Sequence, residues 1–158
     1  MSKQKNIALV AHDARKSELL EWVRFNANEL RNHNLYATGT TAKLISSMEC
    51  KIDEDSDIPT IQLSVTPLLS GPLGGDQQIG AMIAEGKIDI LIFFCDNLAV
   101  QGHQNDVSAL TRLASLYNIG FATNRTTADM ILTSPLLDND DYKRILPPDI
   151  EAYKNRKL

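Results

Sequence analysis

Short apolar runs alternate along the chain with longer segments whose apolar residues recur at helical spacing. Residues Asn6 to Ala11 form a short, largely apolar run that suits a buried strand. The segment after it carries one apolar stripe, which predicts a helix: Leu19, Leu20, Val23, Ala27 and Leu30. The clearest strand, Ile88 to Phe94, is almost continuously apolar, as expected of a central parallel strand that helices cover on both faces.

The same pattern continues through the rest of the chain. It predicts strands at Leu35 to Thr38 and Ile119 to Ala122, a β-rich run within Ile58 to Leu68, and helices at Thr41 to Met48, Gly75 to Glu85, Val107 to Tyr117 and Ala128 to Leu132. The remaining residues are expected to form a polar tail. Because parallel neighbours need crossover helices, this alternation predicts a single doubly wound α/β domain over residues 1–158, with a mostly parallel five-stranded sheet and flavodoxin-like layering.

Polar residues follow the predicted strands. In an open sheet of this kind, the ligand crevice lies beyond the carboxyl ends of the strands. The residues found there are unusually polar: His12 and Asp13, Gly39 to Thr41, Ser70 to Asp76, Asp96 to His103, and Asn124 to Thr126. Five strand ends are therefore predicted to converge on one polar rim.

Composition narrows the ligands that this rim could bind. The net charge is −4, and Lys and Arg are mostly scattered, so there is no broad basic face for nucleic acid or anionic lipid. Any bound phosphate should therefore be small. The amino terminus lacks the features of a secretion signal, and no segment could span a bilayer. Cys50 and Cys95 are isolated, which argues against a zinc site or a disulfide framework and favours a reducing cytoplasm.

The segment YATGTT is a candidate phosphate site. Thr40 and Thr41 open a predicted helix, where hydroxyl side chains more often cap main-chain amides than bind ligands. Together with Gly39, which permits close backbone approach, the amides, hydroxyls and helix dipole attract phosphate, so both interpretations stay open. Lys16 lies about one turn into the first predicted helix, where it either neutralises a phosphate oxygen or is a solvated surface lysine.

Ionisable side chains complete the rim. Asp76 sits at the beginning of a helix after the turn SGPLGGDQQIG, either as a cap or as a base in a desolvated crevice. Four further residues are of types that bind divalent metals: His12, Asp96, His103 and Asp106. None of their pairs has a recognised metal-binding spacing, and Asp13 and Asp106 could equally be helix caps. Neutral imidazole in a phosphate site is the more economical role, so no metal is predicted.

Four blocks of sequence, in order, resemble the pattern of the methylglyoxal synthase family: AHDARK, LYATGTT, LSGPLGGDQQIGAMIAEGKIDILIFF and ATNRTTAD. The similarity spans nearly the whole chain, and GPLGGDQQ followed by EGKIDILIFF is its most diagnostic part. The resemblance implies a carbon–oxygen lyase of the methylglyoxal bypass in glycolysis-linked metabolism. Such an enzyme converts dihydroxyacetone phosphate into methylglyoxal and inorganic phosphate, without a metal or other cofactor.

The resemblance also assigns roles to individual residues. It implies that Asp76 is the catalytic base, with His103 and Asp106 beside it as catalytic residues. The residues that it implies for substrate binding are His12, Asp13 and Asp96 in the pocket wall, and Lys16, Thr38, Thr40, Thr41, Ser70 and Gly71 as phosphate ligands. It further implies a cytoplasmic homohexamer with allosteric behaviour, inhibited by inorganic phosphate.

Three segments depart from the family pattern. The stretch Cys50 to Pro67 is longer than in typical members, and its acidic part, KIDEDSD, is expected to be a solvated loop. The segment CDNLAVQGHQND lacks the family's prolines, although the spacing from Asp96 to His103 is preserved. The family tail supplies an arginine to a neighbouring subunit's site. Arg156 is the nearest candidate here, and Lys157 or no residue are the alternatives.

Two hypotheses from other classes stay open. The same fold serves as the allosteric domain of carbamoyl phosphate synthetase, so the chain could be a non-catalytic effector-binding module, which needs anion ligands but no base. A sugar-phosphate isomerase needs the same base but must prevent elimination. The presence of Asp76 and His103 favours an enzyme over the module, and the identity of the product would separate the lyase from the isomerase.

Overall fold

A five-stranded, entirely parallel sheet is the centre of the computed structural model, which describes residues 4–51, 60–98 and 104–157. The strand order is β3-β2-β1-β4-β5, and each neighbouring pair is parallel. The strands are β1 (Asn6–Ala11), β2 (Asn34–Thr38), β3 (Val65–Leu68), β4 (Ile90–Phe94) and β5 (Gly120–Ala122). The predicted α/β class with a doubly wound sheet is confirmed.

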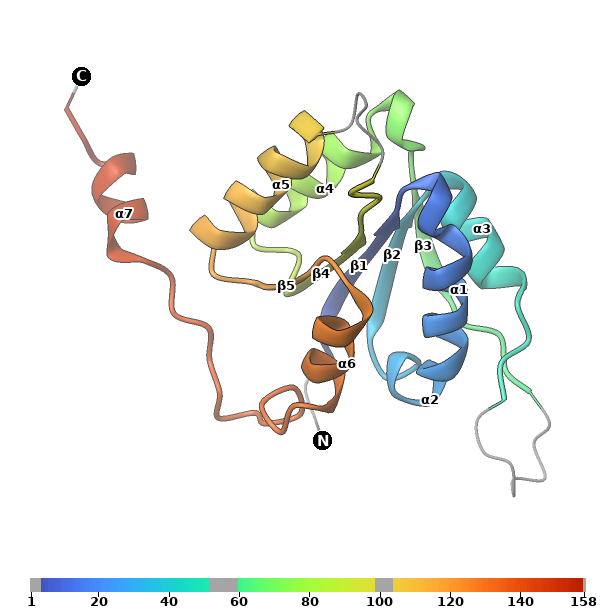
Figure 1. Cartoon of the computed structure of the whole chain (residues 1–158). Coiled ribbons are helices and arrows are strands. Elements are labelled where there is room, and N and C mark those ends of the chain that lie inside the picture. The colour runs from blue at the N-terminus through green and yellow to red at the C-terminus, as the bar shows by residue number, and fades with distance from the viewer. Residues whose placement is uncertain (1–3, 52–59, 99–103, 158) are drawn as a thin grey trace.

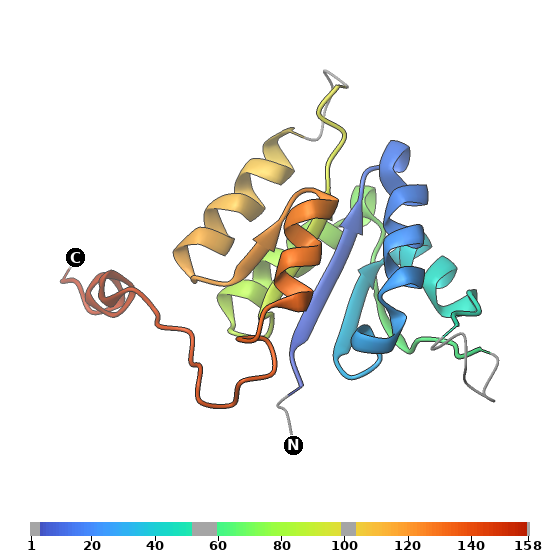
Figure 2. The ribbon, with the colours of Figure 1, turned by 60° about the horizontal axis from the view of Figure 1, so that its bottom comes forward.

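Helices connect successive strands and cover both faces of the sheet, as Figures 1 and 2 show from two directions. One face carries α1 (Lys16–Phe25), α2 (Ala27–Leu30), α3 (Gly39–Ser47) and α6 (Arg125–Thr133). The other face carries α4 (Gly75–Ala84) and α5 (Gln104–Leu116). Two short 3-10 helices, η1 (Asp13–Arg15) and η2 (Gly71–Leu73), precede α1 and α4. The chain therefore changes face between β3 and β4, where the order of strands also reverses direction.

Alternate side chains of the central strands fill two separate cores. In β1, Ile7 and Leu9 pack in the core that contains Trp22, whereas Ala8 and Val10 pack in the core that contains Ile79. Because helices cover both faces, every position of such a strand is apolar rather than every second one. Burying each large apolar side chain stabilises the fold by roughly 1.5–3 kcal/mol, so the sheet is a rigid base for the loops at its ends.

Two predicted segments have different limits in the structure. The single predicted stripe is divided into α1 and α2 at Asn26, whose side-chain Nδ2 donates to the carbonyl of Trp22 at 2.9 Å. The β-rich run contains a strand only at Val65–Leu68, while Ile61 forms an isolated antiparallel bridge with Cys50. Residues 52–59 lie outside the described part of the chain, so the prediction of a solvated loop for the acidic part of this segment stays a prediction.

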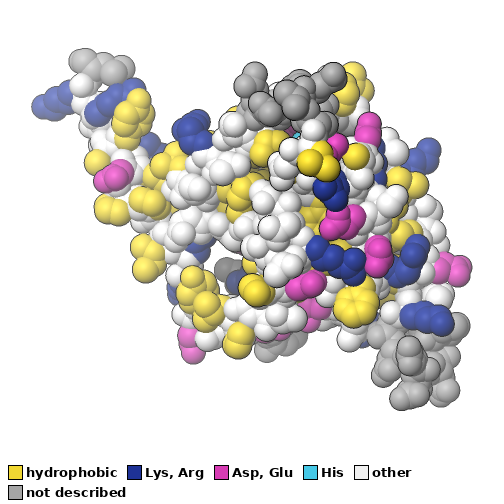
Figure 3. Space-filling view, viewed as in Figure 1, with side chains coloured by type: hydrophobic (Ala, Val, Ile, Leu, Met, Phe, Trp, Pro, Cys, Tyr) yellow, Lys and Arg dark blue, Asp and Glu magenta, His cyan; other side chains and the backbone are white. Residues whose placement is uncertain are grey.

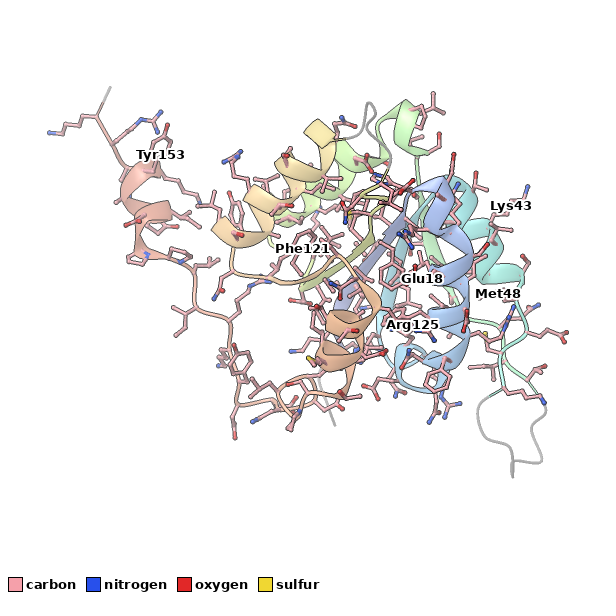
Figure 4. The ribbon with its side chains drawn as sticks, in the orientation of Figure 1. Glu18, Lys43, Met48, Phe121, Arg125 and Tyr153 are labelled. Atoms are coloured by element: carbon pink, nitrogen blue, oxygen red, sulfur yellow. The ribbon has the colours of Figure 1, made fainter. Side chains whose placement is uncertain are left out.

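The segment expected to be a polar tail contains a helix that the sequence analysis did not predict, α7 (Pro148–Lys154). Its signal was a proline at the first helical turn, where the missing N–H costs nothing. Before α7 the chain crosses the amino-terminal edge of the sheet, where Asn118 Nδ2 donates to the carbonyl of Ile145 at 2.9 Å. Figure 4 shows Tyr153 on α7, away from the sheet, and this side chain is 65% exposed. Within the described residues, no helix combines the length and the apolar character needed to cross a membrane.

Candidate active site

The carboxyl ends of four strands meet around one pocket of about 600 Å³, at the end of the sheet toward which the strand arrows point in Figure 2. Its polar lining comes from the residues after β1, β2, β3 and β4: His12, Asp13, Lys16, Thr38, Thr40, Thr41, Ser70, Gly71, Asp76 and Asp96. Val10, Ala11, Ala14, Pro72 and Phe93 supply the apolar part of the wall. The pocket lies beside the switch point between β1 and β4, where doubly wound sheets bind ligands.

The start of α3 is arranged for an anion. The N-cap residue of this helix is Thr38, whose side chain makes no capping bond, so Thr40 and Thr41 lie inside the first turn rather than at the cap. Within the described residues, the Thr41 hydroxyl is buried and has no hydrogen-bond partner. Main-chain amides at a helix start, together with the helix dipole, favour negative charge. This edge of the pocket can therefore accept a phosphate group.

Lys16 supplies a positive charge at the same edge. It is the first residue of α1, because the preceding turn, predicted to be part of the helix, forms η1 instead. The Nζ atom of Lys16 lies 2.7 Å from Oδ1 of Asp13. The Asp13 side chain is 94% exposed and that of Lys16 is 28% exposed. An ion pair this open to water contributes little to stability, so the ammonium can exchange its contact with Asp13 for one with a bound anion.

His12 joins the ends of β1 and β4 in a defined protonation state. The main-chain N–H of Asp96 donates to His12 Nδ1 at 2.8 Å, and the ring contacts Phe93 edge-on with centroids 5.1 Å apart. Because Nδ1 accepts a hydrogen bond, the ring is neutral and carries its proton on Nε2. His12 can therefore donate a hydrogen bond to an oxygen but cannot bind a metal through either nitrogen in this arrangement.

Asp76 lies in the first turn of α4 and lines the same pocket as the threonines. The N-cap of α4 is Gly74, at φ 108°, so Asp76 is not the helix cap that the sequence left as an alternative. A Cβ placed on Gly71 would lie 3.9 Å from Asp76 Oδ2. The carboxylate therefore faces the loop that contains Ser70 and Gly71, within reach of a small molecule held there.

Other ionisable side chains offer neither a nucleophile nor a metal site. Cys95 directly follows β4, and burial raises the pKa of its thiol above the usual value, which keeps it protonated. Farther away, Glu29, His33 and Asp138 have ligand atoms within 4.8 Å of one another, the one such cluster in the described residues. However, the amide of Lys5 donates to His33 Nδ1 at 3.0 Å, so the proton lies on Nε2, which bonds Glu29 at 3.1 Å. In this cluster His33 therefore hydrogen-bonds to Lys5 and Glu29 through its two ring nitrogens, and neither nitrogen is available to a metal.

Three predicted site residues are not part of this pocket's described lining. His103 lies outside the described residues, and for Asp106 the structure gives only its place in the first turn of α5. Arg156 follows α7, which extends away from the sheet in Figure 1, and its guanidinium stacks 3.7 Å from the ring centroid of Tyr153. Its predicted role in a neighbouring subunit's site stays a prediction.

Sequence reasoning missed the residues that shape the pocket without binding anything. Phe93 packs on His12, but its position in a continuous apolar strand gave no sign of this contact. Gln78 accepts a hydrogen bond from the amide of Leu69 at 2.7 Å, next to the predicted phosphate ligands. The motif GGDQQ contains Gln78, so the sequence offered a signal, but only the fold shows its partner.

Comparisons with known proteins identify similar chains. The family model described as MGS-like domain matches residues 18–123. A methylglyoxal synthase of Proteus mirabilis (strain HI4320) is 51% identical over 158 residues, which cover 100% of this chain and 95% of that protein. One from Coxiella burnetii (strain RSA 493) is 49% identical and covers 96% of each chain. The crystal structure of a methylglyoxal synthase from Elizabethkingia anophelis NUHP1 superimposes with a TM-score of 0.80 and 44% identity, over 100% of this chain and 95% of that one.

Proposed function

The chain belongs to the methylglyoxal synthase family, and on this premise we propose that it is a lyase that converts dihydroxyacetone phosphate into methylglyoxal and inorganic phosphate. The observation that carries the proposal is the pocket that Asp76 shares with Ser70, Gly71 and the threonines at the start of α3. A base and a phosphate-binding edge in one small pocket are what this elimination needs.

The first step is proton abstraction. Lys16, Thr38, Thr40, Thr41, Ser70 and Gly71 hold the phosphate group of the substrate, and Asp76 removes a proton from the hydroxymethyl carbon. The resulting negative charge spreads over the enediolate oxygens. Neutral His12 supports this charge through its Nε2–H, and His103 is proposed as a second neutral donor. Asp13, Asp96 and Asp106 complete the wall around the reacting carbons.

The second step is elimination of phosphate. When the phosphate is held out of the enediolate plane, its bridging carbon–oxygen bond overlaps the π system, so the electron pair of the enediolate expels inorganic phosphate. The product is the enol of methylglyoxal, which takes a proton on its methylene carbon to give methylglyoxal. Several simultaneous phosphate contacts fix this torsion, which gives the binding residues a catalytic effect through orientation.

Product analysis tests the proposal. Purified protein is treated with chelator and incubated with dihydroxyacetone phosphate, while inorganic phosphate and trapped methylglyoxal are measured together. Equimolar formation of both without metal supports the lyase. Glyceraldehyde 3-phosphate as the only product would indicate an isomerase. Tight ligand binding without any product would indicate an effector-binding module.

A substitution of the base separates chemistry from binding. We expect Asp76→Asn to bind inorganic phosphate as wild type does, because the amide keeps the shape of the side chain, while turnover falls by roughly 10²-fold or more. Calorimetric titration with phosphate and the product assay measure the two effects. If binding and turnover were lost to the same extent, Asp76 would be a structural residue rather than the base.

The proposal extends to the assembly and its regulation. The apolar side chains of Ile145 and Tyr153 are 78% and 65% exposed, and Figure 3 shows hydrophobic side chains along this carboxyl-terminal segment. Contact with other copies of the chain would cover them, which supports a homo-oligomer; the family resemblance makes it a cytoplasmic hexamer in this proposal. Inorganic phosphate, as a product that fits the same pocket, is the proposed inhibitor, and sedimentation velocity with and without phosphate tests the assembly.

A further inference from the structure

The side chain of Gln78 connects α4 to the loop that follows β3. The main-chain N–H of Leu69 donates to Gln78 Oε1 at 2.7 Å. Leu69 is the first residue beyond β3, whose pairing with β2 ends at Leu68 opposite Thr38. Gln78 therefore supplies an acceptor for the amide at the point where the sheet stops providing one.

This bond spans the two halves of the proposed active site. Leu69 directly precedes Ser70 and Gly71, which line the pocket on its phosphate-binding side. Gln78 lies two residues after Asp76 on the same helix. One side chain thus joins the helix that carries the proposed base to the loop that carries proposed phosphate ligands.

The main-chain bonds of the loop explain why a second attachment matters. The carbonyl of Ser70 accepts from the amides of Leu73 and Gly75, both at 3.0 Å, and that of Gly71 accepts from Gly74 at 3.0 Å. These bonds close the loop on itself and attach it to the first residue of α4. The loop begins at the end of β3 and ends at Gly75 of α4, and the bond from Leu69 to Gln78 adds a side-chain connection between these two ends that limits their movement relative to each other.

We propose that Gln78 is a positioning residue, which sets the orientation of Ser70 and Gly71, and with them the phosphate group, relative to Asp76. The inference rests on the proposed function, in which the torsion of the bridging carbon–oxygen bond decides whether phosphate leaves. The bond contributes little to folding, because Leu69 is about half exposed and water can replace the lost acceptor. Loss of Gln78 therefore affects the site more than the stability of the fold.

The test compares Gln78→Met with Gln77→Met. Methionine keeps the length of the side chain and removes the acceptor, and Gln77 is the exposed neighbour on the same helix turn. For Gln78→Met we expect the Kd of inorganic phosphate, measured by calorimetry, to rise roughly tenfold, because small displacements of positioned groups have large effects. The enediolate should also be protonated more often before phosphate leaves, which raises the share of glyceraldehyde 3-phosphate among the products. Gln77→Met should match wild type in both measurements.

The product ratio separates positioning from a merely structural role, because a smaller folded fraction lowers all products equally. The melting temperature of Gln78→Met should fall by at most about 4 °C, the effect of losing one exposed hydrogen bond in a chain of this size. A phosphate Kd within twofold of wild type would overturn the inference. If wild type formed no methylglyoxal, the proposed function would fail, and the phosphate titrations of the two variants would still decide the role of Gln78.

Discussion

The close approach of α4 to the loop after β3 makes Gly75→Ala a severe test of how packing positions the site. A Cβ at residue 75 would lie 2.0 Å from the carbonyl oxygen of Leu69 and 2.9 Å from Cγ2 of Thr38. Ordinary van der Waals contact begins at 3.4 Å, so the helix and the loop must separate by 3.4 − 2.0 = 1.4 Å. The nearest obstacle is main chain, which cannot change rotamer to relieve the clash.

The magnitude follows from this displacement. Overpacking of this kind costs about 3 kcal/mol, the upper end of the usual range, whereas replacing glycine by alanine restricts the unfolded chain and offsets about 1 kcal/mol. The net loss of about 2 kcal/mol lowers the melting temperature by roughly 4–8 °C in a chain of this length. Asp76 is the next residue, so it moves relative to Ser70, and a shift of about 1 Å can reduce the rate by ~10².

Two further glycines give a graded comparison. In Gly39→Ala the new Cβ lies 3.2 Å from Ser70, a contact that requires a shift of a few tenths of an ångström, so we expect an intermediate loss of kcat/KM. Gly120 lies on β5, and the new Cβ in Gly120→Ala would have Cγ1 of Ile90 as its nearest atom, at 3.4 Å. We therefore expect activity near that of wild type. Circular dichroism melting and the methylglyoxal assay measure the series. Activity of Gly75→Ala equal to that of Gly120→Ala would refute the argument from packing distance.

Two more substitutions distinguish binding from stability. Thr41→Val removes a buried hydroxyl that has no partner within the described residues, so the free energy of unfolding should stay the same or rise. The Kd of inorganic phosphate should increase roughly tenfold. A parallel loss of stability, measured by urea denaturation, would contradict the role of Thr41 in phosphate binding. Asp129→Leu removes the acceptor, 2.8 Å away, for the indole N–H of fully buried Trp22, and should lower the free energy of unfolding by about 1.5–3 kcal/mol with an unchanged phosphate Kd. An unchanged urea midpoint would show that this hydrogen bond is dispensable.

The sequence predicts the sheet well because its signals are local and strong. A continuously apolar run such as Ile88 to Phe94 has few interpretations other than a strand buried on both sides. Element limits were less predictable where a single side chain decides them. At the break, the Asn26 side chain donates to the carbonyl of Trp22, whereas in the sequence the helical stripe continues across this position. The start of α7 was marked by a proline but lacked the apolar periodicity on which the prediction relied.

The grouping of the pocket residues could be predicted because parallel topology alone brings strand ends together. His12 and Asp96 are far apart in sequence, yet β1 and β4 are neighbours, and the amide of Asp96 reaches His12 Nδ1. The protonation state of that ring could not be predicted, since it depends on which atom faces which nitrogen. The contact of Gly75 with Leu69 was unpredictable for the same reason, because it follows from the tertiary distance between a loop and a helix.

The position in the fold of the expected departures from the family pattern indicates which of them would matter for the site. The segment from Cys50, expected to be longer than in typical family members, leads into β3, and an isolated bridge pairs Cys50 with Ile61 before that strand begins. The pocket lies at the other end of β3, so added length before Val65 leaves the loop from Leu69 to Gly75 unchanged. By contrast, the altered segment after Asp96 begins directly at the pocket. Differences in catalysis from typical family members should therefore trace to that segment, and insertions between Leu68 and Asp76 should be far less tolerated than insertions before Val65.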